Sequence, residues 1–297
     1  MAEKILPRKT RYLLFKLWAM FAMVRWINVL VIAAALYLSA MYLLKPNTPR
    51  LEVLKDPKLH LEVIALSLFI MSGYIINAFY DLRKDLINKP KRTYIQRLIS
   101  KQTSLSAYIV FNGLAAILSF FVGWKVLLIN LIFSFALWLY SHKMRKQAFM
   151  GELGATLLTV APFASLAIYY NRITAYIFLY VSFLFMLALT REIIKKLIRF
   201  KGDLVVGERS LPIVIGEKKS RMLALLFMLG SLGQLGSLYF IQWLLRLPLW
   251  FVGLGASGII ISIILILTTK KGSNYNVINW IYKLLIVGSV AGIALIY

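Results

Sequence analysis

The chain has 297 residues, of which 61% are hydrophobic and only 15% are charged, and its formal net charge at pH 7 is +24. A soluble domain has about half apolar and about a quarter charged residues, so this composition excludes an ordinary soluble domain. The chain contains no cysteine, which excludes disulfides, thiol catalysis and cysteine-ligated metals, and its two histidines cannot form a histidine cluster.

Apolar segments follow one another along nearly the whole chain, and each is long enough to cross a ~30 Å hydrocarbon core as a helix. They show no alternation of period two, so we expect an all-α, polytopic membrane bundle rather than a barrel. The nine predicted transmembrane helices lie at about 20–44, 61–80, 106–122, 125–140, 152–170, 173–190, 222–244, 248–267 and 277–297. Because the gaps are short, we expect a single membrane domain over residues 1–297.

Positive charge is concentrated in every second gap between these spans. Residues 81–105 contain seven Lys and Arg and residues 191–221 contain nine, whereas the alternate gaps contain seven in total. This asymmetry follows the positive-inside rule and predicts a cytoplasmic N-terminus and an external C-terminus in a bacterial or archaeal plasma membrane. It argues against nucleic acid as a partner, because most of these charges set topology and attract membrane lipids.

Three polar residues spaced four apart end the second predicted span: Asn77, Asp81 and Asp85. On a helix they share one face. Carboxylates at a membrane boundary are costly unless a cation is bound or paired with them. Such oxygen ligands suit Mg²⁺, which commonly bridges carboxylates and substrate phosphates. A helix end that is simply solvated, with Arg83 and Lys84 as charge partners, remains the alternative interpretation.

A second polar segment follows the sixth predicted span. Lys196, Arg199 and Asp203 lie three and four residues apart, again on one helical face. Residues 207–216 contain two glycines and a proline and are predicted to form a loop before the seventh span. A cationic face beside a carboxylate suits a phosphorylated ligand, because arginine matches phosphate oxygens. A basic helix next to the membrane, without a ligand, is the other interpretation.

Together these segments resemble, in order, the motifs of the UbiA superfamily of intramembrane prenyltransferases. The family's first motif, Asn-Asp-x-x-Asp-x-x-x-Asp with an Asn-Lys-Pro-x-Arg-like stretch after it, is similar to Asn77, Asp81, Asp85 and residues 88–92. Its second region is similar to residues 191–195, Gly202, Asp203, Gly207, residues 210–212 and Gly216. Tyr140, Ser141, Lys143, Gly151 and Glu152 resemble its third cytoplasmic loop, and Arg25 and Asn28 resemble a motif of its first helix.

The resemblance implies helices around a central cavity under a cytoplasmic cap, where Mg²⁺ grips the diphosphate of an isoprenyl donor. Loss of the diphosphate gives an allylic cation, which a lipid or aromatic acceptor attacks. The residues implied as catalytic are Asp81, Asp85 and Asp203. Those implied to hold metal are Asn77, Asp81, Asp85 and Asp203. Those implied to bind the diphosphate are Arg25, Asn28, Lys143, Lys196 and Arg199, while Tyr140 is placed on the acceptor or cation side.

Three residues depart from the family pattern: Ala78, Lys196 and Arg199 stand where carboxylates are usual. Either the protein is an active prenyltransferase with fewer metals, or it binds an isoprenoid or lipid phosphate without turnover. A transporter is disfavoured, because the charged motifs cluster at one face and no inverted repeat is detected. The segments after the sixth span look most like the branch that prenylates geranylgeranylglyceryl phosphate. The sequence leaves the acceptor, the donor length and the oligomeric state open.

Overall fold

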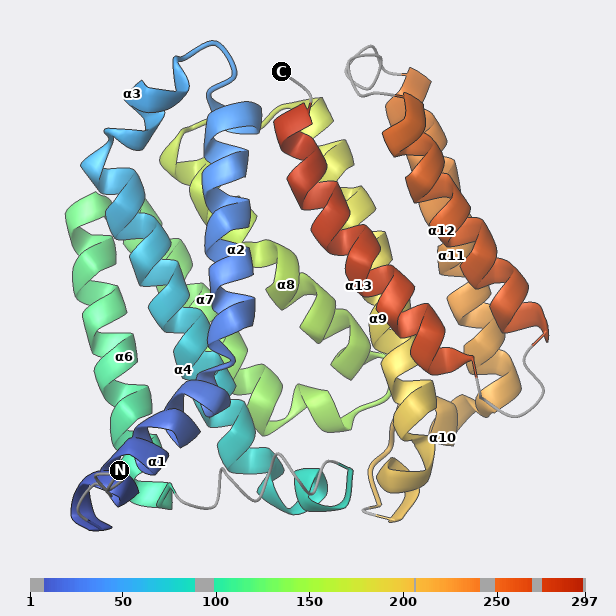
Figure 1. The fold of residues 1–297 in the computed structure, drawn as a ribbon, viewed down its shortest axis with the longest axis horizontal. Helices are drawn as coiled ribbons and strands as arrows, with labels where there is room; N and C mark the ends of the chain where they lie inside the picture. The colour runs from blue at the N-terminus through green and yellow to red at the C-terminus, as the bar shows by residue number, and fades with distance from the viewer. Residues whose placement is uncertain (1–7, 89–98, 206, 241–248, 269–273, 296–297) are drawn as a thin grey trace, which may run out of the picture.

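The computed structural model describes residues 8–88, 99–205, 207–240, 249–268 and 274–295, in which helices occur without any strand (Figure 1). The helices are α1 (Arg8–Val24), α2 (Trp26–Ser39) with a π-helical turn (Ala40–Leu44), α3 (Arg50–Leu54), α4 (Pro57–Asn88), α6 (Lys101–Val122), α7 (Trp124–His142), a 3₁₀ turn (Met144–Lys146), α8 (Met150–Tyr169), α9 (Ala175–Val205), α10 (Leu211–Ile215), α11 (Glu217–Phe240), α12 (Leu249–Thr268), α13 (Tyr275–Gly292) and a last 3₁₀ turn (Ile293–Leu295).

Eight of the described helices are long and apolar enough to cross a membrane. They correspond to the first eight predicted spans, so the all-α prediction is confirmed. The predicted count of nine is not confirmed, because α13 is absent from that set. It is an 18-residue helix that contains Lys283 and packs against α9 and α12. Large apolar side chains such as Phe121, Phe135, Leu226 and Leu254 are exposed on the outer helices, as expected of surfaces in contact with lipid.

The first predicted span, 20–44, is wrong as a single helix. Arg25 has φ 53° and ψ 48°, and this left-handed residue separates α1 from α2. A right-handed helix cannot continue through such a backbone. Consequently only Trp26–Leu44 qualifies as a membrane span, and α1 lies at one end of the bundle (Figure 1).

The two longest helices, α4 and α9, extend beyond the predicted span ends at residues 80 and 190. With 32 and 31 residues, each is about 47 Å long at 1.5 Å per residue, which exceeds the hydrocarbon core. Their last turns therefore carry both polar motifs to the same end of the bundle, the lower end in Figure 1. We call it the motif end. Residues 211–215, predicted as loop, instead form the short helix α10, in which Pro212 occupies a first-turn position that proline tolerates.

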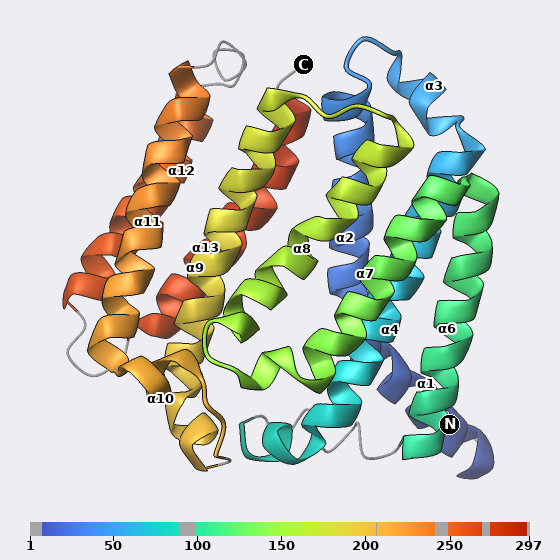
Figure 2. The same cartoon turned by 180° about the vertical axis from the view of Figure 1, so that it is seen from behind.

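Two apolar cores build the bundle, and α9 contributes to both. One core joins α2, α4, α8 and α9 and includes Leu36, Leu66 and Leu166. The other joins α9, α11, α12 and α13 and includes Met228 and Tyr282. Figure 2 shows the same division from behind, with α11 and α12 on one side and α4, α6 and α7 on the other. Between them, α9 packs against α8, α11 and α13.

A buried polar network joins four helices at the opposite end from the motifs. It consists of Glu62 on α4, Ser119 on α6, Asn130 on α7 and Ser165 on α8, each at most 2% exposed. Asn130 Nδ2 lies 3.0 Å from Glu62 Oε2 and 3.0 Å from Ser119 Oγ. Ser165 Oγ lies 2.6 Å from Glu62 Oε1 and 2.7 Å from Asn130 Oδ1. We call these four residues the distal clamp, because they fix α4, α6, α7 and α8 to one another.

Candidate functional site

At the motif end, an arginine from the short turn between α7 and α8 reaches the first motif. Arg145 donates a hydrogen bond to Asn77 Oδ1 and forms an ion pair with Asp81, both on α4. Asn77 and Asp81 are therefore brought together, as predicted. Sequence reasoning missed Arg145 itself. The only signal was its place among three basic residues in 141–150, and that signal was explained equally well by membrane topology.

The backbone fixes the position of Arg145. A Cβ on Gly151 would lie 2.8 Å from the Arg145 carbonyl oxygen, so only glycine permits this approach of α8 to the turn. Burial and the nearby Arg199 guanidinium lower the pKa of Arg145 to about 10, while the carboxylates of Glu208 and Asp203 act in the opposite direction. Arg145 is thus a buried cation at neutral pH, with Asp81 beside it and Asp203 within electrostatic reach.

The second motif places its charges on the facing helix. Asp203 and Lys196 of α9 are 0% and 8% exposed, so both are buried at the motif end. Lys196 lies within electrostatic reach of the Glu152 carboxylate, which is in the first turn of α8 and is 1% exposed. The positive end of a helix dipole attracts negative charge at such a position. Lys196, predicted to bind diphosphate, therefore lies beside an internal carboxylate.

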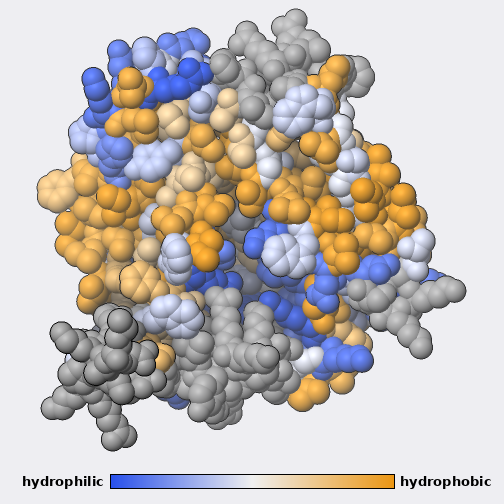
Figure 3. Space-filling model, in the orientation of Figure 1, coloured by the Kyte–Doolittle hydropathy of each residue, from blue (hydrophilic) through white to orange (hydrophobic). Residues whose placement is uncertain are grey.

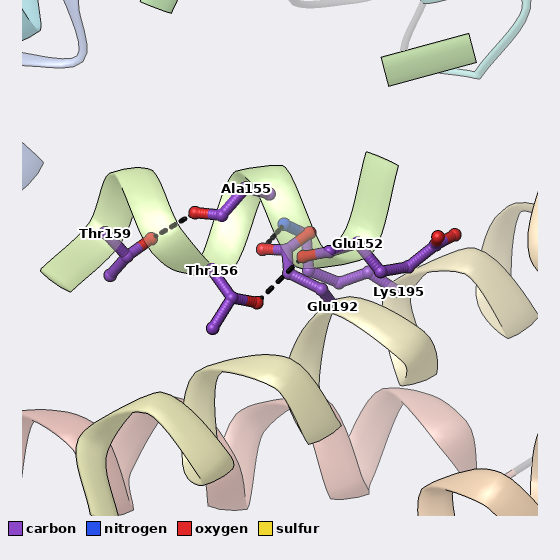
Figure 4. Close-up of polar contacts among 6 residues, drawn as sticks. All are labelled: Glu152, Ala155, Thr156, Thr159, Glu192 and Lys195. Atoms are coloured by element: carbon purple, nitrogen blue, oxygen red, sulfur yellow. Dashed lines mark hydrogen bonds and ion pairs between the residues drawn. The ribbon is translucent and has the colours of Figure 1, made fainter. Parts of the chain in front are cut away.

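One turn closer to the bundle centre, Lys195 Nζ and Glu192 Oε1 form an ion pair at 2.5 Å. Figure 4 shows this pair beside the start of α8, with the Glu152 carboxylate extending away from it. Thr156 Oγ1 donates to the Glu152 carbonyl oxygen at 2.8 Å and leaves the Glu152 carboxylate uninvolved.

Tyr140 lies near charged groups of both signs. It is within electrostatic reach of Glu192 and Glu152 and also of Arg199 and Arg25. A Cβ on Gly154 would approach the Tyr140 ring to 3.1 Å, so this glycine lets the ring pack against α8. The structure therefore places the predicted acceptor-side residue within the same cluster as both motifs.

Three further arginines come from separate parts of the chain: Arg25 at the α1–α2 break, and Arg191 and Arg199 on α9. We call them the arginine triad. Arg25 and Arg199 both lie within electrostatic reach of Arg191. The Arg25 guanidinium stacks 5.0 Å from the centre of the Tyr74 ring. Within the described part of the chain, none of the three forms an ion pair, and the buried Arg191 Nε has no hydrogen-bond partner.

The Glu192 carboxylate lies within electrostatic reach of Arg191 and Arg199 but is itself paired with Lys195, so among the described residues the triad carries excess positive charge. Like charges held close together repel one another, and a buried donor without a partner costs free energy. An anion with several oxygens would satisfy both requirements at once, since arginine presents paired N–H donors to phosphate oxygens. Figure 3 shows hydrophilic residues gathered in a hollow near the centre of one face, framed by apolar side chains. Sequence reasoning included Arg191 in the second motif but gave it no role.

The donor set at this site limits metal binding. Among the side chains that the structure describes, no group of three or more His, Asp or Glu is placed to hold a metal ion. Asn77 and Asp81 offer suitable oxygens, but both contact Arg145. Asp85 lies in α4, and its side chain is outside the described residues. On the α9 side, Glu192 is paired with Lys195, and Asp203 shares its helical face with Lys196 and Arg199. These residues fit one Mg²⁺ on α4 better than a pair of ions.

Two predicted diphosphate ligands are not drawn into the cluster. Lys143, which caps the end of α7, and Asn28, in the first turn of α2, are both exposed. Within the described residues, no side chain forms a hydrogen bond or ion pair with either of them. The structure thus gathers Asn77, Asp81, Tyr140, Arg25, Lys196, Arg199 and Asp203 at the motif end.

Curated proteins similar in sequence include digeranylgeranylglyceryl phosphate synthases of archaea. The one from Pyrococcus horikoshii is 31% identical over 156 residues, which are 52% of this chain and 56% of that protein. The one from Korarchaeum cryptofilum is 31% identical over 180 residues, which are 59% of this chain and 63% of that protein. The match thus spans a little over half the length of these relatives.

Solved structures with the same fold cover nearly the whole chain. One, from work on digeranylgeranylglyceryl phosphate synthase in membranes, has a TM-score of 0.68 at 21% identity and covers 94% of this chain and 98% of its own. A UbiA homologue from Archaeoglobus fulgidus bound to GPP and Mg²⁺ has a TM-score of 0.65 at 17% identity, covering 93% and 99%. The model of the UbiA prenyltransferase family matches residues 35–284. This integral membrane protein therefore belongs to the UbiA prenyltransferase family.

Proposed function

We propose that this protein transfers an isoprenyl group from an isoprenyl diphosphate to an acceptor within the membrane. Family membership supports a prenyl transfer reaction, and the A. fulgidus homologue was solved with the prenyl diphosphate GPP and with Mg²⁺. The single observation that carries the proposal for this chain is the arginine triad, whose three guanidinium groups lack an ion-pair partner in the described structure.

The diphosphate of the donor binds to the triad. It brings two or three negative charges and five terminal oxygens, so it offsets the repulsion among Arg25, Arg191 and Arg199. It also provides an acceptor for the buried Arg191 Nε. The same contacts strengthen as the carbon–oxygen bond breaks, because the departing diphosphate takes the electron pair and gains charge. Preorganised cations at that position lower the barrier to ionisation.

Asn77, Asp81 and Asp85 would hold one Mg²⁺ on α4, and the ion, when bound, would neutralise part of the charge on the leaving diphosphate. On the α9 side, the guanidinium groups of Arg199 and Arg191 neutralise charge on the leaving diphosphate in place of a second metal ion. Asp203 stabilises the buried Arg145 and thereby the geometry of the first motif. Carboxylates lost at positions 78, 196 and 199 are in this way compensated by a single ion and three cationic side chains.

Acceptor attack takes place beside Tyr140, where apolar helices exclude the water that would quench an allylic cation. The relatives named as digeranylgeranylglyceryl phosphate synthases favour a glyceryl phosphate lipid as the acceptor. An aromatic acceptor is the other class compatible with the family. We propose that the motif end faces the cytoplasm, in keeping with its basic charge, and that the protein comes from an archaeal membrane, as its relatives do.

The test is a transfer assay with purified protein in detergent, geranylgeranyl diphosphate and Mg²⁺. A geranylgeranylglyceryl phosphate lipid and aromatic acids are supplied as separate acceptors. Mass spectrometry of the products and release of diphosphate are the readouts. We expect a doubly alkylated glyceryl phosphate. Failure of every acceptor, together with tight donor binding, would instead establish binding without turnover, for which the structure offers no specific support.

A further inference from the structure

The distal clamp contains a glutamate with no cation beside it. Glu62 is 0% exposed, and no ion pair involves it within the described residues. The titratable groups at this end of the helices packed around it include Asp56, Lys58 and His60 near the start of α4, Tyr37 on α2, Lys125 on α7 and Tyr169 on α8. Tyr180 on α9 donates its hydroxyl proton to the Ser289 carbonyl oxygen. His60 Nδ1 is already bound by the Tyr37 hydroxyl at 2.8 Å, Asp56 by Tyr169, and Lys125 is exposed.

Counting protons in the clamp shows that an ionised Glu62 leaves one contact unsatisfied. Ser165 has a single hydroxyl proton, yet its oxygen lies 2.6 Å from Glu62 Oε1 and 2.7 Å from Asn130 Oδ1. A carboxylate and an amide oxygen can only accept, so one of these two contacts would bring two lone pairs together with no proton between them. Both distances are those of O–H···O hydrogen bonds.

One additional proton, on Glu62, satisfies every contact. Glu62 then donates to Ser165 Oγ, Ser165 donates to Asn130 Oδ1, and the two N–H groups of Asn130 reach Glu62 Oε2 and Ser119 Oγ. The result does not depend on how the Asn130 amide is oriented. If its oxygen and nitrogen exchange places, the Asn130 oxygen faces the Glu62 carboxyl, and that contact again requires a proton on Glu62.

We propose that Glu62 is a proton-binding site, a neutral carboxylic acid at neutral pH that closes a hydrogen-bond ring of α4, α7 and α8 at the distal end, to which Ser119 of α6 is joined through Asn130. A buried charge without a partner is expensive in a membrane protein, whereas a neutral acid with its hydrogen bonds made is tolerated. The bound proton therefore holds α4, α7 and α8 together at one end, and these same helices carry Asn77, Tyr140 and Glu152 at the other.

Infrared difference spectroscopy tests this directly. The spectrum of the wild-type protein minus that of Glu62→Gln at neutral pH should contain the carbonyl band of a protonated carboxylic acid, shifted in D₂O. Ser165→Ala removes the acceptor of the acid proton and should move the same band to higher frequency. Glu52→Gln, at an exposed position on α3, is the matched control and should leave the band in place. Absence of a protonated-carboxyl band in the wild type would overturn the proposal.

Thermal unfolding provides an independent readout that does not require catalysis. The glutamine of Glu62→Gln can donate to Ser165 and accept from Asn130 as the acid does, so its Tm should stay within about 2 °C of wild type. Glu62→Ala removes one buried partner from each of Asn130 and Ser165 and leaves a cavity, so it should lower Tm by about 5 °C or more. Equal losses in the two variants would contradict a protonated Glu62. If Glu62→Gln cannot be purified, the Ser165→Ala shift decides.

Discussion

The motif end and the distal clamp are both buried polar clusters, but they differ in whether their own residues satisfy them. In the clamp, Glu62 and Asn130 find all their partners on neighbouring helices. At the motif end, Arg191 Nε has no hydrogen-bond partner, and Arg25 and Arg199 have no ion-pair partner within the described residues. A closed network stabilises a fold, whereas an excess of one charge identifies a place for a ligand. Burial of polar groups alone would not have distinguished them.

The largest expected effect comes from removing the unsatisfied arginine. Arg191→Ala should lower the rate of diphosphate release by about 100-fold or more, the usual cost of losing one preorganised charge donor. Arg191→Lys should recover only part of the rate, because lysine keeps the charge but not the paired donors. Steady-state release assays measure both. Lys125→Ala, at an exposed position far from the motif end, serves as the control. If Arg191→Ala changed the rate of diphosphate release by less than threefold, the motif end would not be a ligand site in the way that separates it from the distal clamp.

The next effect concerns stability rather than activity. Asn130→Leu should reduce the free energy of unfolding by about 2–4 kcal/mol, since Glu62, Ser119 and Ser165 each lose a buried partner. The KM for the donor should not change, because the clamp lies about 28 Å along α4 from Asp81 at 1.5 Å per residue. Unfolding in detergent and donor titration measure the two quantities. A raised KM with normal stability would show that the clamp belongs to the site.

Arg145 shares a property with each cluster. It is charged, as the arginine triad is, and it is paired with a neighbouring side chain, Asp81, as the clamp residues are. Arg145→Gln should raise the affinity for Mn²⁺, used as a spectroscopic substitute for Mg²⁺, by about tenfold, since it frees the oxygens of Asn77 and Asp81 from a competing cation. Electron paramagnetic resonance of free Mn²⁺ measures this without turnover. Unchanged affinity would mean that the guanidinium does not compete with the ion.

The pKa of Arg145 adds a pH condition to that experiment. Because its pKa in the folded protein is about 10, the residue stays protonated from pH 6 to about 9, and its competition with Mn²⁺ should be constant over that range. Raising the pH through 10 removes the proton, so the wild-type affinity should then approach that of Arg145→Gln. A rise in wild-type affinity already near pH 7 would point to a different titrating group.

The smallest effects are expected at the two predicted ligands that the structure leaves outside the cluster. Lys143→Ala and Asn28→Ala should each change the rate of diphosphate release by less than about threefold, because exposed side chains contribute little preorganised charge. Arg199→Ala, assayed in parallel, should lower the rate of diphosphate release far more and is the reference for a large effect. A loss of 30-fold or more in Lys143→Ala would extend the binding site beyond the triad.

Sequence reasoning recovered the features that depend on local pattern. Apolar length predicted the long helices α2, α4, α6, α7, α8, α9, α11 and α12, and i, i+4 spacing placed Asn77 and Asp81 on one face. It failed where contacts join distant segments. Glu62 lies 68 residues from Asn130 and 103 from Ser165, so the sequence of its predicted span, residues 61–80, shows a single charged residue and neither of these partners. Arg145 is likewise 68 residues from Asn77. The break at Arg25 was missed because nothing in the local sequence signals a left-handed residue there.

The left-handed backbone of Arg25 has a consequence for how this protein could evolve in the laboratory. An L-residue other than glycine, asparagine or aspartate adopts this conformation at a cost of about 1 kcal/mol or more. Asparagine at position 25 would relieve much of that cost but would remove one charge of the triad. Selection for thermal tolerance alone should therefore enrich asparagine at this position and lower enzymatic activity. Selection for turnover should restore arginine. At the break between α1 and α2, one residue thus lowers the stability of the fold while contributing to its activity.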